Sequence, residues 1–357
     1  MSTFRILCID GGGIRGIIPA VILAEIERRT GQPISELFDL IAGTSTGGIL
    51  TLALVKPDPD KKDRPQHTAE DVIRLYETKG RRIFSRSVLH RLVSLDGLAN
   101  KKYQTGPIEK VFGEFFGDAL LSDALTDVMI TSFDVQLRDA FFFRSYRAKA
   151  NKEYDYLMRD AARATSAAPT YFEPELIKKG KNSYALIDGG VFANNPAMCA
   201  LVDSLREFNN EENKKYGLHE IFMVSLGTGS ETERPLEFNR VKNWGLVNWA
   251  QPLLNIVFNG ISDTVNYQTD LFLNPEGGTQ QFYRLQVEGL TKSLSEMDNV
   301  SAKNIRTLRQ RAEKFLKTDE AEKDISAICR ALTMEEPLAK KKPASRTRRA
   351  RSKPLAA

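Results

Sequence analysis

One serine in this sequence stands in a setting that suits nucleophilic chemistry. Ser45 is the centre of a G-x-S-x-G string that lies between an apolar run and a helical pattern. This is the setting of a nucleophile elbow, where a sharp strand-to-helix turn needs small neighbours and lifts the hydroxyl above the sheet. The alternative is a tight turn with a structural role alone. We predict Ser45 as a nucleophile, with Gly43 and Gly47 as motif glycines.

A glycine-rich loop follows the first apolar run, in "ILCIDGGGIRG". Its G-x-G-x-x-G spacing also matches a dinucleotide fingerprint, but that fold needs an acidic residue after the second strand, where this chain has Gly43-Thr44-Ser45. Glycine amides at the start of a helix bind negative charge. Beside a serine nucleophile that charge is the oxyanion of acyl transfer, which we favour over a dinucleotide. The predicted oxyanion loop comprises Gly11, Gly12, Gly13 and Arg15, followed by the motif glycine Gly16.

A base for the serine is predicted in "YALIDGGVFANNP". Asp188 ends a predicted strand there and precedes the motif glycines Gly189 and Gly190. In a parallel sheet, the loops after Asp10, Gly43 and Ile187 would open on one edge, so Asp188 could bond the serine hydroxyl directly. Burial among apolar neighbours would raise the pKa of this carboxyl toward a useful value for a base.

A triad with histidine is the competing arrangement. The order Ser45, Asp188, His219 matches that of some hydrolases. However, His219 precedes the predicted strand 221–226, and about seven residues at ~3.3 Å each place it near the opposite sheet edge. His67 and His90 have no fixing partner in the pattern. A serine–aspartate dyad is therefore the prediction.

The elements that position these residues alternate between strand and helix. This alternation predicts an α/β fold with a mainly parallel sheet in a single domain. Predicted strands cover residues 4–9, 37–42, 128–134, 140–146, 184–187 and 221–226. Predicted helices cover residues 17–29, 70–79, 154–166, 196–208 and, as the last one, 301–316. Residues 43–55 are predicted as a turn followed by a buried helix.

Charge divides the 357-residue chain into a body and a tail. The net charge is +5, but eight of the 51 basic residues lie between Lys340 and Lys353, so the remainder is slightly acidic. We predict one domain at residues 1–335 and a disordered basic tail at 336–357. A solvated tail is the simplest interpretation, with contact to anionic lipid or nucleic acid as the alternative. No specific nucleic acid binding is expected.

The remaining composition is that of a globular protein, with 41% hydrophobic and 27% charged residues. No apolar run is long enough for a membrane span, and the first residues lack the layout of a secretion signal. Three distant cysteines favour a reduced, cytoplasmic setting, and no metal-ligand spacing or cofactor is indicated. Residues 81–98 mix apolar and basic side chains, and residues 244–258 combine two tryptophans with aliphatic side chains next to basic residues. They are interpreted either as membrane-contact or acyl-channel elements, or as helices packed on the sheet.

The chain resembles the patatin-like phospholipases from Arg5 to about Leu316, through "DGGGIRG", "GTSTGG" and "DGGVFANNP" and also "ARATSAAPTYF" and "VSLGTG". The resemblance implies a three-layer α/β fold and a calcium-independent lipid acyl hydrolase. It implies that the Ser45–Asp188 dyad cleaves phospholipid esters at a membrane surface, that Gly11 to Gly13 supply oxyanion amides, and that contact with membranes is peripheral. The basic tail lies outside the family pattern, and the role of Arg15 stays open.

Two further interpretations stay open. One is a storage or binding protein that uses the same fold without catalysis, since a fold alone does not establish activity. The other is a phospholipase effector of bacterial antiphage defence, activated by a cyclic dinucleotide. The sequence leaves the head-group preference, the choice between sn-1 and sn-2 esters, and the oligomeric state undetermined.

Overall fold

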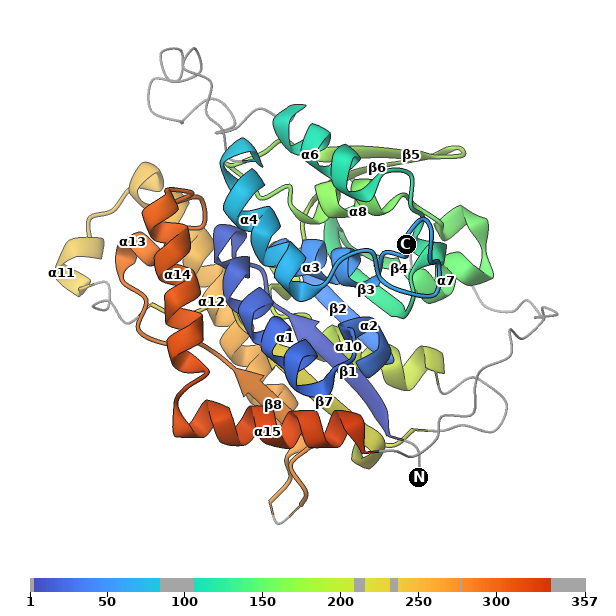
Figure 1. Ribbon diagram of the computed structural model, residues 1–357. Helices are drawn as coiled ribbons and strands as arrows, with labels where there is room; N and C mark the ends of the chain where they lie inside the picture. The colour runs from blue at the N-terminus through green and yellow to red at the C-terminus, as the bar shows by residue number, and fades with distance from the viewer. Residues whose placement is uncertain (1–2, 84–105, 209–215, 232–236, 277, 335–357) are drawn as a thin grey trace.

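The computed structural model describes residues 3–83, 106–208, 216–231, 237–276 and 278–334, and an eight-stranded sheet runs through these residues (Figure 1). The strands are β1 (Phe4–Ile9), β2 (Leu40–Thr44), β3 (Asp127–Asp134), β4 (Asp139–Arg144), β5 (Glu175–Lys179), β6 (Asn182–Asp188), β7 (Ile221–Leu226) and β8 (Phe282–Leu285). Their order is β5-β6-β3-β2-β1-β7-β8, with β4 paired to β3 outside this path.

Parallel pairing dominates the centre of the sheet, where β1 pairs with β2 and β7, β2 with β3, and β7 with β8. The pairs of β3 with β4, β3 with β6, and β5 with β6 are antiparallel. The predicted α/β class and mainly parallel sheet are therefore confirmed. The assumption that the strand before Asp188 runs parallel to its neighbours was wrong.

Helices cover both faces of the sheet. They are α1 (Ile17–Thr30), α2 (Ile34–Leu37), α3 (Thr46–Val55), α4 (Ala69–Ile83), α6 (Gly106–Phe116), α7 (Ser145–Ala150), α8 (Met158–Thr165), α9 (Gly190–Ala193), α10 (Ala197–Glu207), α11 (Phe238–Val241), α12 (Leu246–Leu273), α13 (Lys292–Ser295), α14 (Ala302–Phe315) and α15 (Asp319–Thr333). Short 3-10 turns are η1 (Gly13–Gly16), η2 (Leu121–Asp123), η3 (Lys152–Tyr154) and η5 (Leu218–Glu220).

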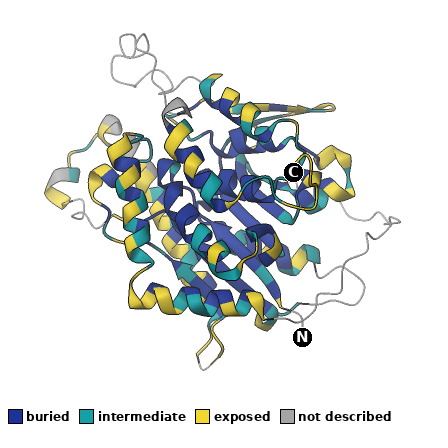
Figure 2. Cartoon of the chain, viewed as in Figure 1, coloured by how far each residue is buried: buried dark blue, intermediate teal, exposed yellow. Residues whose placement is uncertain are grey.

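Strand β1 shows how the three layers arise. Successive side chains of a strand point to opposite faces. Leu7 and Ile9 accordingly join the larger core cluster, which includes α1 and α3. Ile6 and Cys8 join a second cluster, which contains residues of α10 and Leu273 of α12. The strand is buried on both sides, as Figure 2 shows for the centre of the sheet.

Several elements differ from the prediction. Strands β5 and β8 were not predicted, because one is a polar edge strand and the other has four residues. The predicted helix at 154–166 begins only at Met158, after a 3-10 turn. Residues 301–316 are not the last helix, since α15 follows, capped by the Thr318 side chain, which accepts from the backbone N–H of Ala321.

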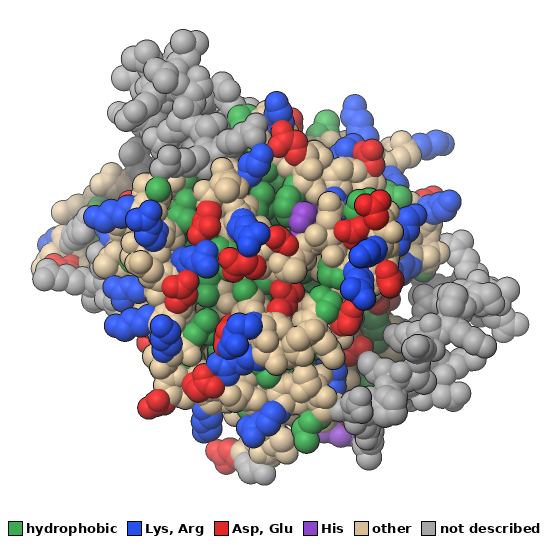
Figure 3. All heavy atoms as spheres, viewed as in Figure 1, with side chains coloured by type: hydrophobic (Ala, Val, Ile, Leu, Met, Phe, Trp, Pro, Cys, Tyr) green, Lys and Arg blue, Asp and Glu red, His purple; other side chains and the backbone are tan. Residues whose placement is uncertain are grey.

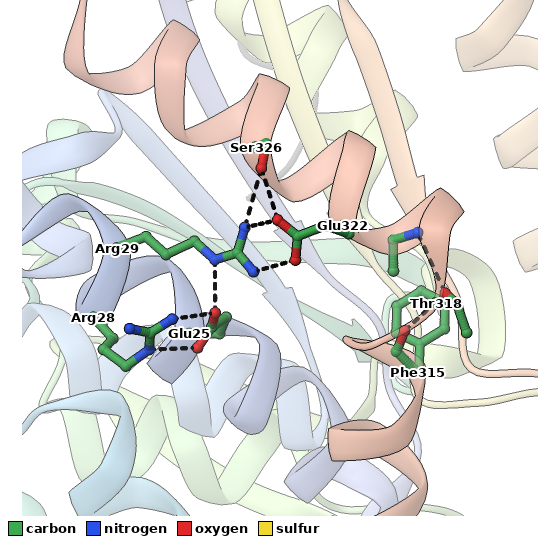
Figure 4. A network of polar contacts seen from close by, with 8 residues as sticks. Glu25, Arg28, Arg29, Phe315, Thr318, Glu322 and Ser326 are labelled. Atoms are coloured by element: carbon green, nitrogen blue, oxygen red, sulfur yellow. Dashed lines mark hydrogen bonds and ion pairs between the residues drawn. The ribbon is translucent and has the colours of Figure 1, made fainter.

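Helix α15 docks on α1 through a polar network, shown in Figure 4. Arg29 of α1 donates hydrogen bonds to Glu322 at 2.7 and 2.8 Å and to Glu25 at 2.6 Å. Exposed ion pairs stabilise a fold only slightly. The buried side chains of Ile325 and Ile328 therefore supply the main adhesion of this helix to the core.

The surface in the view of Figure 3 carries interspersed acidic and basic side chains over α1, α4 and α14. In the described part of the chain no helix has the length and apolar character needed to cross a bilayer. The predicted tail at 336–357 and most of the stretch at 81–98 lie outside the described residues, as does His90.

Candidate active site

Ser45 sits at the sharp turn between β2 and α3. Its backbone has φ 55° and ψ −123°, which is a strained conformation for a residue with a side chain. A Cβ at Gly43 would collide with the carbonyl oxygen of Gly47, and a Cβ at Gly47 would collide with that of Ile9. Both motif glycines are therefore needed because backbone segments approach each other closely there.

Side-chain hydroxyls of buried threonines fasten this turn. The Ser45 N–H donates to Thr165 Oγ1 at 2.8 Å, and Thr165 Oγ1 donates to the Thr131 carbonyl at 2.7 Å. Thr44 Oγ1 donates to the Ala193 carbonyl at 2.6 Å. Thr165 was not predicted as a site residue, although it lies in the "ARATSAAPTYF" segment that carries part of the family resemblance.

Strand β6, which ends at Asp188, meets β2, which ends just before Ser45, end to end. Thr44 pairs with Thr131 of β3, and Asp188 pairs with the next residue, Ser132. Strand β4 pairs with β3 along the same residues, so it occupies the other edge of β3. Strands β2 and β6 therefore share one edge of β3, and their carboxyl ends face each other. This arrangement, and not a parallel strand, brings Asp188 to Ser45.

The Asp188 carboxyl is 1% exposed, lines the same pocket as Ser45, and accepts a hydrogen bond at 2.7 Å from the Gly190 N–H. Burial raises the pKa of this carboxyl to about 7, and its interactions with the Ser45 side chain and the Gly190 N–H offset only part of that effect. A carboxyl that titrates near neutral pH is a stronger base than an ordinary aspartate. The pair is thus arranged for proton transfer from serine to aspartate.

The glycine loop between β1 and α1 presents two amides to the same place. Gly12 and Gly13 line a pocket together with Ser45. Within the described residues, their backbone N–H groups form no hydrogen bond. The Gly11 N–H differs, since it donates to the Asn194 carbonyl at 3.0 Å. Of the three glycines in the predicted oxyanion loop, Gly12 and Gly13 are therefore the two whose amides have no partner among the described residues.

Arg15 holds the loop from behind. Its buried guanidinium donates to the carbonyl of Gly12 at 3.3 Å and to that of Gly229 at 3.1 Å. Burial lowers the pKa of Arg15 to about 10. The C=O and N–H of a trans peptide point in opposite directions. By fixing the Gly12 carbonyl, Arg15 also fixes the direction of the Gly13 N–H.

A buried ion pair lies at the base of the glycine loop. Asp10 Oδ2 lies 2.6 Å from Arg284 Nη2, and Arg284 also donates to Ser225 Oγ at 2.8 Å. No pattern in the sequence indicated that Asp10 and Arg284 form a pair, because they are 274 residues apart. The pair ties the end of β1 to β7 and β8.

The pocket beside Ser45 encloses about 680 Å³ between protein atoms, its open mouth included. Its wall is mainly apolar, and Ser45, Asp188 and Asn194 are among its polar members. The large apolar side chains that line it are Ile49, Ile108, Tyr171, Phe172, Phe258 and Met297. Such a wall suits a hydrocarbon chain next to a polar reaction centre.

The remaining motif glycines pack tightly, since a Cβ at Gly16 would meet Thr46 and one at Gly189 would meet Thr131. His219 lies in η5, which precedes β7, and its side chain is 74% exposed. It is therefore at the opposite end of β7 from the carboxyl end of that strand. His67 stacks on Phe115 at 4.1 Å. Among the described residues no cluster of His, Cys, Asp or Glu could hold a metal ion.

Comparison with known proteins agrees with this geometry. The family described as "Patatin-like phospholipase" matches residues 7–201. The chain belongs to the patatin-like phospholipase family. "Patatin-like protein 2" of Arabidopsis thaliana is 32% identical over 351 residues, covering 91% of this chain and 85% of that protein. "Patatin-like protein 1" of the same plant is 30% identical, covering 88% and 82%.

A third relative carries a different name. "Probable inactive patatin-3-Kuras 1" of Solanum tuberosum is 30% identical, covering 89% of this chain and 87% of its own. Among solved structures, "Crystal structure of VipD from Legionella pneumophila" matches with 12% identity and a TM-score of 0.34, covering 93% of this chain and 74% of that one. Membership of the family supports lipid acyl hydrolysis in general.

Proposed function

We propose that this patatin-like phospholipase hydrolyses carboxylic esters of phospholipids with Ser45 and Asp188 as its catalytic dyad. The observation that carries the proposal is the pairing of the Ser45 side chain, at its strained turn, with a buried carboxyl whose pKa is about 7. The amides of Gly12 and Gly13, which have no hydrogen-bond partner among the described residues, and the apolar pocket lined by Ser45 and Asp188 support it.

The reaction begins when Ser45 Oγ attacks the ester carbonyl carbon and its proton passes to Asp188. The resulting oxyanion accepts hydrogen bonds from the N–H groups of Gly12 and Gly13, which are already in place. The bond to the alcohol then breaks, and Asp188 returns the proton to the leaving oxygen. A lysolipid departs, and the acyl group stays on Ser45.

Water completes the cycle. It attacks the acyl carbonyl while Asp188 takes one of its protons, and the collapse of the second oxyanion returns that proton to Ser45 Oγ. The products are a free fatty acid and the restored dyad. No step in this sequence requires calcium, and the acyl chain would occupy the pocket between Phe172 and Phe258.

The test is fatty acid release from phosphatidylcholine vesicles by the wild type and by Ser45→Ala, each with a calcium chelator. We expect release by the wild type only, with unchanged rate in the chelator. Absence of Ser45-dependent release would favour the non-catalytic storage or binding protein; the name of the potato relative contains the word "inactive". A parallel series with added cyclic dinucleotides tests whether an activator is required. Vesicles with acidic or zwitterionic head groups then define the head-group preference.

A further inference from the structure

The first half of α12 turns apolar side chains away from the protein. From Leu246 to Ser262 the sequence contains no acidic or basic residue. Leu253 is nevertheless 50% exposed and Ile256 is 44% exposed. A surface helix ordinarily carries charged or polar residues on its outer face. In the described part of this half-helix the exposed side chains are aliphatic residues and asparagines, and none of them is charged.

The exposed Leu253 and Ile256 and the half-buried Trp249 form a line along the helix. Trp249, Leu253 and Ile256 follow each other at spacings of four and three, which places them on one side of an α-helix. The buried side chains of Phe258 and Ser262 lie on the opposite side. We call Trp249, Leu253 and Ile256 the docking stripe.

The same helix is part of the candidate active site. Phe258 lines the pocket that contains Ser45. Ser262 Oγ accepts a hydrogen bond at 3.0 Å from Asn194 Nδ2, which belongs to the segment after Asp188. Because a helix rises 1.5 Å per residue, Ile256 and Phe258 are about 3 Å apart along the axis. One side of α12 thus closes the pocket while the other side faces outward.

We propose that the docking stripe lies on the surface of a phospholipid bilayer and brings the Ser45 pocket to its substrate, an inference that rests on the proposed function. A charge-free helical face with protruding aliphatic residues enters the boundary between head groups and acyl chains. Trp249, which packs against Trp244 at 5.1 Å, suits that boundary.

The residues around the stripe fit the same occupant. The exposed Lys242 precedes it in the sequence, where a basic side chain can meet lipid phosphates. Phe238, on the neighbouring α11, is 75% exposed, and Figure 1 shows α11 at the left edge of the molecule, away from the sheet. The second half of α12 adds Asp263 and Asp270 beside the exposed Tyr267 and Leu271, so the charge-free part of the helix is its first half.

The binding experiment uses the full chain with Ser45→Ala, so that vesicles stay intact. Sedimentation with vesicles of phosphatidylcholine, a zwitterionic lipid without net charge, measures partition with little electrostatic attraction of the basic tail. Leu253→Glu with Ile256→Glu should weaken partition at least about tenfold, since half-exposed aliphatic side chains lose their burial in lipid. Leu176→Glu is the matched control: Leu176 is 54% exposed on β5, at the opposite edge of the sheet, and its change should leave partition intact.

The activity experiment uses Ser45-intact protein with two substrates. Hydrolysis of vesicle phosphatidylcholine should fall with partition in the Leu253→Glu, Ile256→Glu variant, while hydrolysis of a soluble p-nitrophenyl ester stays within about twofold. Leu253→Gln with Ile256→Gln repeats the test without added charge. Equal loss on both substrates would show a structural role and overturn the proposal, as would unchanged partition.

Two other results separate the alternatives. If analytical ultracentrifugation finds a wild-type dimer that the double variant converts to a monomer, a second copy of the chain covers the stripe, and the proposal is overturned. If neither substrate is cleaved in a Ser45-dependent way while partition still depends on the stripe, the proposed function fails and the docking surface stands.

Discussion

Thr44 and Asp188 occupy consecutive positions along one edge of β3, opposite Thr131 and Ser132. The nucleophile turn and the base turn therefore arrive from opposite directions and stop against each other. The relationship between Ser45 and Asp188 is set by sheet register. Both turns are kept in place by the hydrogen bond that Thr44 donates to the Ala193 carbonyl and by the one that Thr165 accepts from the Ser45 N–H.

Replacement of either dyad member should remove nearly all esterase activity. Asp188→Asn keeps the size of the side chain but removes its charge and its ability to take up the proton. We expect a loss of at least about a thousandfold, comparable to Ser45→Ala, and little further loss when both changes are combined, because the two residues act as a unit. Initial rates on a soluble ester measure this.

His219→Ala is the control for that experiment. The side chain is exposed and lies before β7, so activity should stay within a few-fold of the wild type. A collapse of several hundred-fold in a folded His219→Ala protein, or near-normal turnover by Asp188→Asn, would favour a triad over the dyad.

The pH profile should report the Asp188 carboxyl. Only the ionised form can accept the serine proton, and burial raises its pKa to about 7. We expect kcat/KM to rise with pH through about 7 and then level off. A rate that levels off already near pH 4, the range of an ordinary aspartate, would contradict the assignment of this carboxyl as the base.

The same carboxyl should make stability depend on pH. The pKa of Asp188 is about 7 in the folded protein, whereas an ordinary aspartate, as in the unfolded chain, has a pKa of 3.8. The folded state therefore holds the proton more tightly between these two pH values. Stability from this group is therefore full below about pH 4 and is lost as pH rises to about 7. Asp188→Asn cannot ionise. It should exceed the wild type by up to about 4 kcal/mol at pH 8 and match it near pH 4, in urea unfolding.

The oxyanion loop can be tested at Gly12. A Cβ there would collide with the side chain of Thr228, which braces the loop by donating to the Gly11 carbonyl at 2.8 Å. Gly12→Ala should displace the amides and lower kcat by about 10²–10³, the usual effect of losing one donor. Gly113→Ala on α6 is the control, since a Cβ there meets no atom and should cost no activity. Equal rates for both variants would remove Gly12 and Gly13 from the mechanism.

Arg15 offers a test of positioning. Arg15→Lys retains the charge but loses the planar group that bonds the carbonyls of Gly12 and Gly229. We expect kcat to fall about tenfold with KM nearly unchanged, because the Gly13 amide would lose its fixed direction. A change in KM alone would indicate contact with the substrate instead.

The local parts of the site were predictable, and the distant ones were not. Ser45, Asp188 and the glycine loop were visible because each needs a short motif with small residues at fixed spacing. The direction of β6 depends on its pairing with β3, which no local pattern encodes. Thr165, Asn194 and the Asp10–Arg284 pair act through partners far along the chain, so their residue types alone gave no sign of a role.

Because β2 and β6 share one edge of β3, esterase activity reports whether β6 has its native register. A one-residue slip of β6 would leave secondary structure and compactness almost unchanged, yet it would turn the Asp188 side chain to the other face of the sheet. Circular dichroism would not detect that error, whereas a single turnover assay would. In refolding or in variants of the β5–β6 hairpin, recovered esterase activity is therefore a stricter measure of the native state than any spectrum of the backbone.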